Sequence, residues 1–428
     1  MKNSKRLDEW YEMSRKCMRC GLCRSVCPVF DVLGTESSVS RGKVQLIRAL
    51  LEHRLEPTKT LKQMVSLCLN CGACSANCPS GIKVHEMILS ARAELLAKLG
   101  QPAMERVILR VVAADSGRMA LGAKATALYQ KTGLHWLAHK TRLLSLLPGD
   151  LDTREEFVPN IPLRTARTKL MEVNGPDSAR MRVAYFLGCA SNLLEPSVAV
   201  AVVEVLTHHN CQVVVPSKLE CCGMPHRSYG DTQMAAKLEQ TNVDILNKAN
   251  VDAIVVDCAT CGSTLKRYEG LRAPVYDVSE FLADVVGLSG DGLHEVGVKV
   301  TYHDPCHLVR EQSVIAAPRQ LIRSVPGIEF VEMAEADRCC GGGGSFNLTH
   351  YEVSMAILDR KMRNILDTSA TIVASGCPSC RMQINYGIRR ERKRRKSEGE
   401  AIANGLPVEV LHPVELLARA LRDNRAST

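Results

Sequence analysis

The chain of 428 residues is poor in aromatic side chains, which make up 4% of it, and it has no long apolar run. Its longest apolar stretch, residues 107–114, is interrupted by Arg110 and is far shorter than the roughly 18 residues that a membrane-spanning helix needs. The polar N-terminus, MKNSKRLDEW, lacks the apolar segment of a secretory signal peptide. We therefore expect an aliphatic core, no transmembrane helix and a cytoplasmic location.

Motifs that bind nucleotide cofactors are also missing from the sequence. The glycine run at 341–344 permits close approach of the backbone to a cluster or cofactor. It does not form the strand, G-x-G-x-x-G and helix arrangement that binds dinucleotides. No recognisable flavin, nicotinamide or phosphate loop occurs elsewhere, so we expect any such cofactor to be carried by another protein.

Positive charge is concentrated in one place. The formal net charge is +9, and residues 389–396 (RRERKRRK) hold seven basic groups and one acidic group. The rest of the chain is close to neutral, which argues against nucleic-acid binding. We interpret the basic run as a solvated loop or helix end. A docking contact with anionic lipid or an acidic partner subunit is the alternative.

Cysteine, by contrast, is abundant, with 19 residues. Reducing conditions in the cytoplasm disfavour disulfides and leave thiolates free to bind metal. Two copies of the motif C-x2-C-x2-C-x3-C, each followed by proline, occupy residues 17–28 and 68–79. This spacing is typical of bacterial two-cluster ferredoxins. The sequence therefore predicts a protein that carries electrons through buried iron–sulfur clusters.

In two-cluster ferredoxins, each motif gives three cysteines to one cluster and its fourth to the other. The first [4Fe–4S] cluster is then expected to be bound by Cys17, Cys20, Cys23 and Cys78. The second is expected to be bound by Cys68, Cys71, Cys74 and Cys27. A zinc site is the alternative, but zinc takes one tetrahedron from two C-x2-C pairs, which fits this repeated run poorly.

The second half of the chain is an internal duplication. A single cysteine, a Cys-Cys-Gly triplet and a C-x2-C pair occur twice, at positions 117 to 119 residues apart. The first copy has Cys189, Cys221, Cys222, Cys258 and Cys261. The second copy has Cys306, Cys339, Cys340, Cys377 and Cys380. Five cysteines in register favour metal binding in at least one copy, with one or two further iron–sulfur clusters preferred over zinc.

Other interpretations of these copies stay open at this point. A zinc ion in each copy, or buried cysteines acting as small hydrophobic side chains, would also account for them. Adjacent cysteines such as Cys221 and Cys222 suit an unusual cluster better than an ordinary cube. Cys211 has Glu329 as its counterpart and lies in a strand-like run, so we expect an inert core thiol.

Four histidines lie near the cysteine motifs: His85, His226, His303 and His307. The segment His-Asp-Pro-Cys-His at 303–307 is the most suggestive, since it could supply a proton relay or a metal ligand. A histidine that is hydrogen-bonded at a strand end is the commoner outcome for each of them alone. We therefore assign no catalytic residue from the sequence.

Hydrophobic periodicity predicts a mixed fold. Helical spacing at 44–51, 61–65 and 84–99 indicates an α-helical two-cluster ferredoxin domain at 1–96. A helical connector at 97–180 follows, with a surface segment that contains Pro148, Pro159, Pro162 and Pro176. Two tandem α/β cysteine-rich domains at 181–290 and 295–428 complete the chain. Their strands are expected at 183–187, 212–215, 253–256, 299–302, 328–332 and 371–373, and helices at 232–247 and 353–366.

These motifs resemble the iron–sulfur subunit of glycolate oxidase and its relatives among 2-hydroxyacid dehydrogenases. The matching text is KCMRCGLCRSVCPVF, then SRGKVQLIRALLE, then CLNCGACSANCPSGIKVHEMI. The duplicated Cys-Cys-Gly module is also similar to modules of heterodisulfide reductase and of anaerobic glycerol-3-phosphate dehydrogenase. In some glycolate oxidase subunits the last C-x2-C pairs are degenerate, whereas here both pairs are intact.

The resemblance implies an electron-transfer subunit of a glycolate- or lactate-type dehydrogenase complex. Its partners would be an FAD-containing hydroxyacid dehydrogenase subunit and a quinone or other electron acceptor, with a peripheral contact on the inner face of the cell membrane as a further option. The intact C-x2-C pairs favour an alternative, a heterodisulfide-reductase-like catalytic subunit in which a cluster in a Cys-Cys-Gly module cleaves a disulfide.

Overall fold

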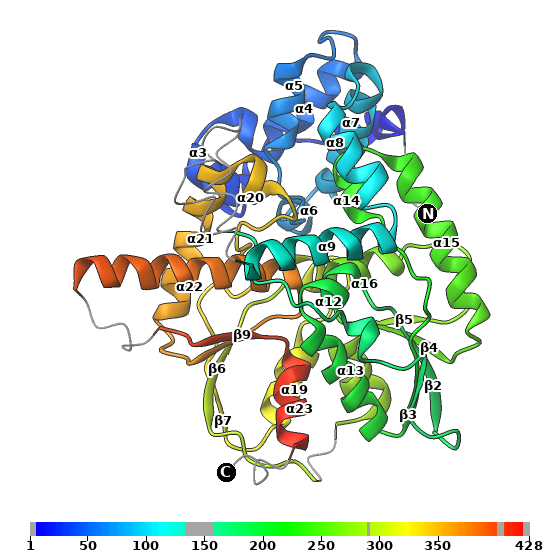
Figure 1. Cartoon of the computed structure of the whole chain (residues 1–428). Coiled ribbons are helices and arrows are strands. Elements are labelled where there is room, and N and C mark those ends of the chain that lie inside the picture. Colours follow the sequence, from blue (N-terminus) through cyan, green and yellow to red (C-terminus); the bar gives the residue numbers. More distant parts are fainter. Residues whose placement is uncertain (1–5, 133–156, 289–291, 400–405, 423–428) are drawn as a thin grey trace.

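The computed structural model describes residues 6–132, 157–288, 292–399 and 406–422 (Figure 1). A helical N-terminal region lies against two α/β modules, each built on its own sheet (Figure 1). This arrangement confirms the predicted mixed fold. Among the described helices, none is both long enough and apolar enough to cross a membrane.

The N-terminal region consists of short helices around the two cysteine loops. Buried Trp10, Val44, Ile47 and Met87 are among the side chains that form its core, at the helical spacing that the sequence predicts. Its elements are η1 (Leu7–Trp10), α1 (Tyr11–Arg15), α2 (Leu22–Ser25), α3 (Pro28–Leu33), η2 (Glu36–Ser38), α4 (Ser40–Leu51), α5 (Lys59–Ser66), α6 (Ala73–Ala76) and α7 (Val84–Leu99).

The connector is less detached from the fold than the sequence suggests. Residues 157–174 return to the first module, where Ala166 is fully buried in the core. Their last two residues form a strand that pairs antiparallel with the first module's sheet. Pro148 lies outside the described residues. The connector's elements are α8 (Ala103–Val107), η3 (Ile108–Val112), α9 (Ser116–Lys131), η5 (Ala166–Thr168) and β1 (Val173–Asn174).

The first module is a five-stranded sheet of order β1-β3-β2-β4-β5, in which β2 to β5 are parallel. The strands β3 and β4 are short and buried throughout, and β2 is buried over its last three residues, as parallel strands covered on both faces are. Its elements are β2 (Met181–Tyr185), α12 (Cys189–Leu193), α13 (Pro196–His208), β3 (Cys211–Val214), α14 (Met224–Ser228), α15 (Thr232–Lys248), β4 (Ala253–Val256), α16 (Ala259–Leu265), β5 (Val275–Asp277), α17 (Val278–Glu280) and η6 (Phe281–Val286).

The second module repeats this topology with a parallel sheet of order β7-β6-β8-β9. The order matches β3-β2-β4-β5, so the duplication that the cysteines indicate extends to the fold. Its elements are β6 (Val298–Tyr302), α18 (Cys306–Val309), α19 (Ala316–Ser324), β7 (Ile328–Phe330), α20 (Phe346–Thr349), α21 (Tyr351–Leu366), β8 (Ile372–Ala374), α22 (Pro378–Glu398), β9 (Glu409–Leu411) and α23 (Pro413–Leu421).

The two modules pack together around an approximate two-fold axis. Helix α13 of the first module lies against α23 of the second (Figure 1), and α19 of the second lies against η6 of the first. These contacts are equivalent, because α13 corresponds to α19 and η6 corresponds to α23 in the duplication. One hydrophobic core therefore contains residues of both modules, among them Val202, Leu206, Leu417 and Ala418.

Candidate metal centres

The loop that precedes α2 and the loop that follows α6 enclose a first cavity. Five cysteines line it: Cys17, Cys20, Cys23 and Cys78, and also Cys74 at the wall it shares with a second cavity. Apart from Cys74, they are the four that the sequence groups as ligands of the first cluster. Cys20 is exposed, whereas the other three are partly covered, so this cavity lies near the surface of the molecule.

A second cavity lies next to the first and is lined by Cys27, Cys68, Cys71 and Cys74. Cys74 lines both cavities, so they share a wall. Burial raises the pKa of Cys27 to about 11 and that of Cys74 to about 12. These thiols stay protonated at neutral pH unless a cation stabilises the thiolates, which fits a site for iron.

The cysteine loops have the same backbone conformation in both motifs. Arg19 and Gly21 have φ angles of 56° and 89°, and Asn70 and Gly72 have φ angles of 55° and 71°. Left-handed residues at these positions turn successive N–H groups toward one side of a loop and form an anion-binding concavity. The N–H of Asn70 already points to the sulfur of Cys68, at 3.4 Å. The loops therefore fit an anionic cluster.

The first module places its cysteines at the carboxyl ends of neighbouring strands. Cys189 follows β2, and Cys258 follows β4 and accepts a hydrogen bond from the N–H of Cys261 at 3.5 Å. The strand order reverses between β2 and β4, which is where parallel sheets bind their ligands. Cys221 and Cys222 reach the same place from the loop before α14 and contact Cys189 and Cys261.

The second module builds the equivalent site at the ends of β6 and β8. Cys306 begins α18, Cys377 precedes α22, and Cys380 lies in the first turn of α22. Cys339 and Cys340 complete the set, and Cys340 contacts Cys380. Interactions in which the Cys380 thiol donates to the sulfurs of Cys340 and Cys377, together with burial, raise the pKa of Cys380 well above its ordinary value. Five crowded thiols in a buried site cannot all ionise without metal, so the donor set fits a cluster.

Cysteines of different modules touch each other. The thiols of Cys258 and Cys377, which are equivalent in the duplication, lie close together at the boundary between the first and second modules, and their proximity shifts the pKa of both. Cys71 of the second cavity likewise lies close to Cys339 of the second module, in the same buried cluster. The backbone N–H of Ala259 also donates to the carbonyl of Gly376 at 3.0 Å. The four cysteine sites therefore form one continuous series through the molecule.

A buried charge cluster that the sequence did not indicate lies where the three regions meet. The Glu311 side chain is 2% exposed and pairs with Arg267. Its Oε1 lies 3.6 Å from Nε2 of His85 and 4.0 Å from Nε2 of His307. Burial alone would raise the pKa of Glu311, but His307 and Arg267 outweigh it and bring the pKa below its usual range. His307 is four residues from Glu311, but Arg267 and His85 come from distant segments, so no local sequence pattern could bring the four groups together.

The four predicted histidines differ in their surroundings. His226 donates from Nε2 to the Leu109 carbonyl at 2.9 Å, and His85 is hydrogen-bonded to Ser75 at 2.8 Å through Nδ1. His307 is hydrogen-bonded through Nδ1 to Thr260. Only His303 among these four has both ring nitrogens unpartnered in the described part of the chain. Burial lowers its pKa to about 3, so its imidazole is neutral at physiological pH.

One cysteine lies apart from the four sites. Cys211 in β3 is 1% exposed and packs in the hydrophobic core with Val213 and Leu206. Burial raises its pKa to about 11. This confirms that Cys211 is a core thiol, and its inertness stays a prediction.

Four segments of the chain match models of known protein families. Residues 13–82 match a 4Fe-4S dicluster domain, and residues 183–266 and 300–385 each match the cysteine-rich domain named CCG. Residues 100–158 match the linker region of the glycolate oxidase iron-sulfur subunit. The chain accordingly holds multiple iron–sulfur clusters, two of them of the [4Fe–4S] type.

Individual relatives are also iron–sulfur subunits or proteins related to them. The probable glycolate oxidase iron-sulfur subunit of Bacillus subtilis (strain 168) is 32% identical over 397 residues, covering 88% of this chain and 89% of the relative. A subunit of the dihydromethanophenazine:CoB–CoM heterodisulfide reductase of Methanosarcina barkeri (strain Fusaro / DSM 804) is 25% identical over 95% of this chain and 93% of its own. Lactate utilization protein A of Exiguobacterium sp. (strain ATCC BAA-1283 / AT1b) is 29% identical over 56% of this chain and 98% of its own. With the cysteine sites, the linker and this coverage in agreement, the chain belongs to the family of glycolate oxidase iron–sulfur subunits.

Proposed function

We propose that this protein is the electron-transfer subunit of a complex that oxidises a 2-hydroxyacid of the glycolate or lactate class. A separate FAD-containing subunit would remove two electrons from the hydroxyacid, and this chain would pass them singly to a quinone or another acceptor. The proposal rests on the continuous series of four cysteine sites. The linker match at 100–158 supports the hydroxyacid class, because the matching model describes the linker region of glycolate oxidase iron-sulfur subunits.

In this proposal, Cys17, Cys20, Cys23 and Cys78 bind one cluster, and Cys68, Cys71, Cys74 and Cys27 bind the other. The ten cysteines of the two modules bind further iron. Bound clusters supply the one-electron chemistry, while the protein supplies position, burial and nearby charge. Contacts such as Cys71 with Cys339 keep neighbouring sites close enough for electron transfer.

Anaerobic purification of the complex from its host tests the proposal. Glycolate or lactate should bleach the visible absorption of the iron–sulfur centres when the flavoprotein is present, and the isolated chain should not respond. If the isolated chain oxidised either acid with an artificial acceptor, the proposed division of labour would be wrong.

A matched pair of variants tests the series itself. Cys339→Ser removes the thiol that contacts Cys71, so transfer from hydroxyacid to the final acceptor should be strongly reduced while the flavoprotein still oxidises its substrate with an artificial acceptor. Cys211→Ser changes a buried cysteine of the core and should leave electron transfer intact. Equal effects of the two substitutions would contradict a series that runs through Cys339.

The second candidate function is a heterodisulfide-reductase-like catalytic subunit. Both C-x2-C pairs are present and buried, Cys258 with Cys261 and Cys377 with Cys380, and the heterodisulfide reductase relative is similar over nearly the whole chain. This function predicts disulfide reduction by the purified protein, abolished by Cys340→Ser with the ferredoxin-type signals kept. Absence of that activity in the unmodified protein would eliminate this candidate.

We also propose that this protein is cytoplasmic and that it contacts the inner face of the cell membrane when the electron acceptor is a quinone. The end of α22 carries the basic run and projects beyond the modules (Figure 1), and Arg392 and Lys396 are exposed there. The complex should sediment together with vesicles that contain anionic lipid at low salt, and it should stay in the supernatant at high salt. Equal retention by neutral vesicles would contradict the electrostatic contact.

A further inference from the structure

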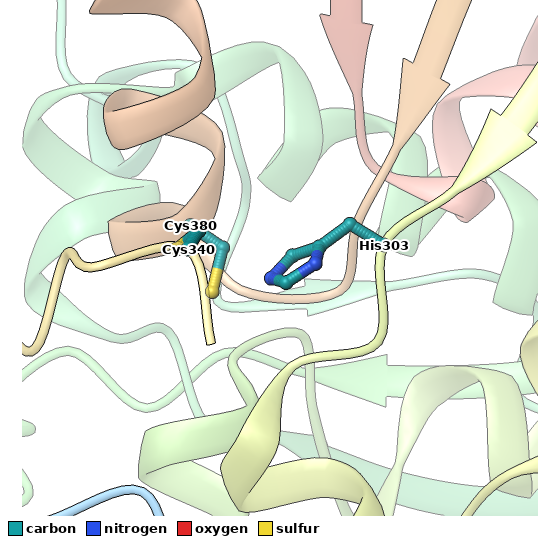
Figure 2. Close-up of side chains that lie close together, drawn as sticks. All are labelled: His303, Cys340 and Cys380. Carbon is teal, nitrogen blue, oxygen red and sulfur yellow. The ribbon is translucent and has the colours of Figure 1, made fainter. Parts of the chain in front are cut away.

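The cysteine site of the second module has an additional side chain that no family match assigns. His303 lies at the end of β6, and one of its ring nitrogens and the sulfurs of Cys340 and Cys380 all lie within 4.8 Å of one another. Figure 2 shows the imidazole ring pointing toward these cysteines. A metal ion takes histidine nitrogen at about 2.0–2.1 Å and cysteine sulfur at about 2.3 Å, so a bound ion would draw these three atoms slightly closer together than the 4.8 Å limit.

The hydrogen bonding of His303 also indicates a missing partner. Its side chain is 1% exposed, and neither ring nitrogen has a hydrogen-bond partner among the described residues. Buried polar groups in folded proteins are nearly always satisfied, so an imidazole left without a partner points to a bound group. Histidines that bind a metal often donate from their other ring nitrogen to a nearby acceptor such as a backbone carbonyl. The carbonyl of Ala336 lies near the His303 ring. It already accepts a hydrogen bond from the Asp304 N–H at 3.1 Å.

The duplication supplies an internal comparison. The position equivalent to His303, 117 residues earlier, is Phe186, which is fully buried and apolar. The first module therefore offers thiolates alone, whereas the second offers thiolates and a neutral imidazole. Had the histidine only a packing role, an apolar side chain of similar size would fill the same place, as it does in the first module.

We propose that His303 is a nitrogen ligand, beside Cys340 and Cys380, of the iron centre in the second module. The two modules are then chemically different. An imidazole that replaces a thiolate ligand brings no negative charge to the iron centre. Iron–sulfur centres with histidine ligands accordingly have higher reduction potentials than those bound by cysteine alone. The proposal concerns metal ligation only and does not depend on which acid or disulfide the complex uses.

Hyperfine spectroscopy on the whole protein, purified anaerobically with its clusters, tests this directly. Chains labelled with ¹⁵N in the histidine ring should show a nitrogen coupling to an iron–sulfur signal, and His303→Phe and His303→Cys should remove it. The cysteine variant supplies a replacement ligand, so it should keep the iron content even if the phenylalanine variant loses iron. His209→Gln, in the first module and away from the cysteine sites, is the control and should keep the coupling.

Two results would overturn the assignment. One is the absence of any histidine ring coupling in the labelled protein across potentials at which each centre is paramagnetic. The other is a coupling that persists unchanged in His303→Cys. In both cases the imidazole would be a neighbour of the centre and not its ligand.

Discussion

At the residue scale, a buried ion pair joins the two modules. Arg381 in α22 is 1% exposed; its Nε lies 3.1 Å from Glu195 Oε1, and its Nη1 donates to the Ser375 carbonyl at 2.7 Å. The equivalent contact on the other side of the approximate two-fold axis has Gly262 close to the Gln312 side chain. The pair is therefore an asymmetric feature, and removing Glu195 leaves the buried Arg381 guanidinium without its hydrogen-bonded carboxylate.

We predict that Glu195→Gln destabilises the protein by about 3 kcal/mol, because the Arg381 charge then lacks its counter-ion inside the protein. The matched control is Glu204→Gln, which affects an exposed pair with Arg422 and should cost less than about 1 kcal/mol. Anaerobic denaturant unfolding of the three proteins measures both values. Similar costs for the two substitutions would contradict the difference in burial on which this prediction rests.

Asp277 predicts a pH dependence of stability. Burial raises the pKa of its carboxyl to about 7; one oxygen accepts from the Ser279 N–H at 2.9 Å, and the other has no partner among the described residues. The folded protein keeps this proton to higher pH than the unfolded chain, whose aspartates titrate near 3.9. Stability therefore falls as the pH rises from about 4 to about 7.

Asp277→Asn should remove that slope, since asparagine keeps the cap of α17 and has no proton to lose. The variant should gain stability relative to the unmodified protein as the pH is raised from about 5 to about 8, and thermal unfolding across that range measures the gain. Asp244→Asn, at an exposed position of α15, should leave the profile unchanged. Parallel profiles for Asp277→Asn and the unmodified protein would show that the carboxyl does not titrate in this range.

At the element scale, the sequence located the helices α7, α15 and α21 and the central strands well, but it did not predict α13 or the full length of α22. The predicted helix at 84–99 coincides with α7, and the predicted strand at 253–256 coincides with β4. Both have strong periodicity or an apolar run bounded by turns. The strands β1, β5 and β9 were missed because each has two or three residues and lies at the edge of a sheet, where pairing and not composition defines it.

The basic run at 389–396 is another segment whose secondary structure depends on its neighbours in the fold and not on its composition. It forms the last turns of α22, in agreement with the interpretation as a helix end. Glu391 pairs with Arg394 and Arg395 at helical spacing, and Arg390 pairs with Asp359 of α21. These pairs reduce the repulsion among like charges along the helix. Composition alone could not separate a helix from a loop here.

Gly230 fixes how the N-terminal region docks on the first module. Its φ is 90°, and an added Cβ would lie 2.6 Å from the carbonyl oxygen of Arg92 in α7. We predict that Gly230→Ala lowers the melting temperature by several degrees, because the clash is with backbone that cannot move aside without separating the two regions. Limited proteolysis should also cut the N-terminal region more readily in this variant.

The control for this prediction is Gly34→Ala. Gly34 has a φ of 64° and open space around it, so it carries the same kind of backbone strain without a clash. It should cost about 1 kcal/mol and leave proteolysis unchanged. Equal melting temperatures and equal proteolysis of the two variants would contradict the prediction that Gly230 is needed for close approach to α7.

At the scale of the whole molecule, the sequence indicated which cysteines belong together but not how the groups meet. Motif spacing is local information, and it grouped Cys27 with the loop at 68–74, which lines the same cavity. The contact of Cys71 with Cys339 joins residues 268 positions apart and depends on how the N-terminal region docks on the second module. Glu311 was missed for the same reason.

If each ferredoxin-type motif gives its fourth cysteine to the other cluster, the cluster that a cysteine variant loses can be predicted. Cys27→Ser should damage the cluster whose other cavity residues are Cys68, Cys71 and Cys74, and Cys78→Ser should damage the one near Cys17. Iron analysis should show a loss of up to about four iron atoms in each variant, and the paramagnetic signals that disappear should differ between them. Loss of the same signal in both variants would contradict ligation across the motifs.

The approximate two-fold packing of the modules has a consequence for how the protein arose. Equivalent residues that touch each other, as Cys258 and Cys377 do, are what two identical subunits present on either side of a symmetry axis. The pairing of α13 with α23 and of α19 with η6 is likewise the self-complementary contact of a homodimer. The second half of the chain thus has the arrangement of a homodimer whose two copies are joined in one polypeptide by duplication. Because the two copies are separate parts of one sequence, equivalent positions are free to differ, as Phe186 and His303 do.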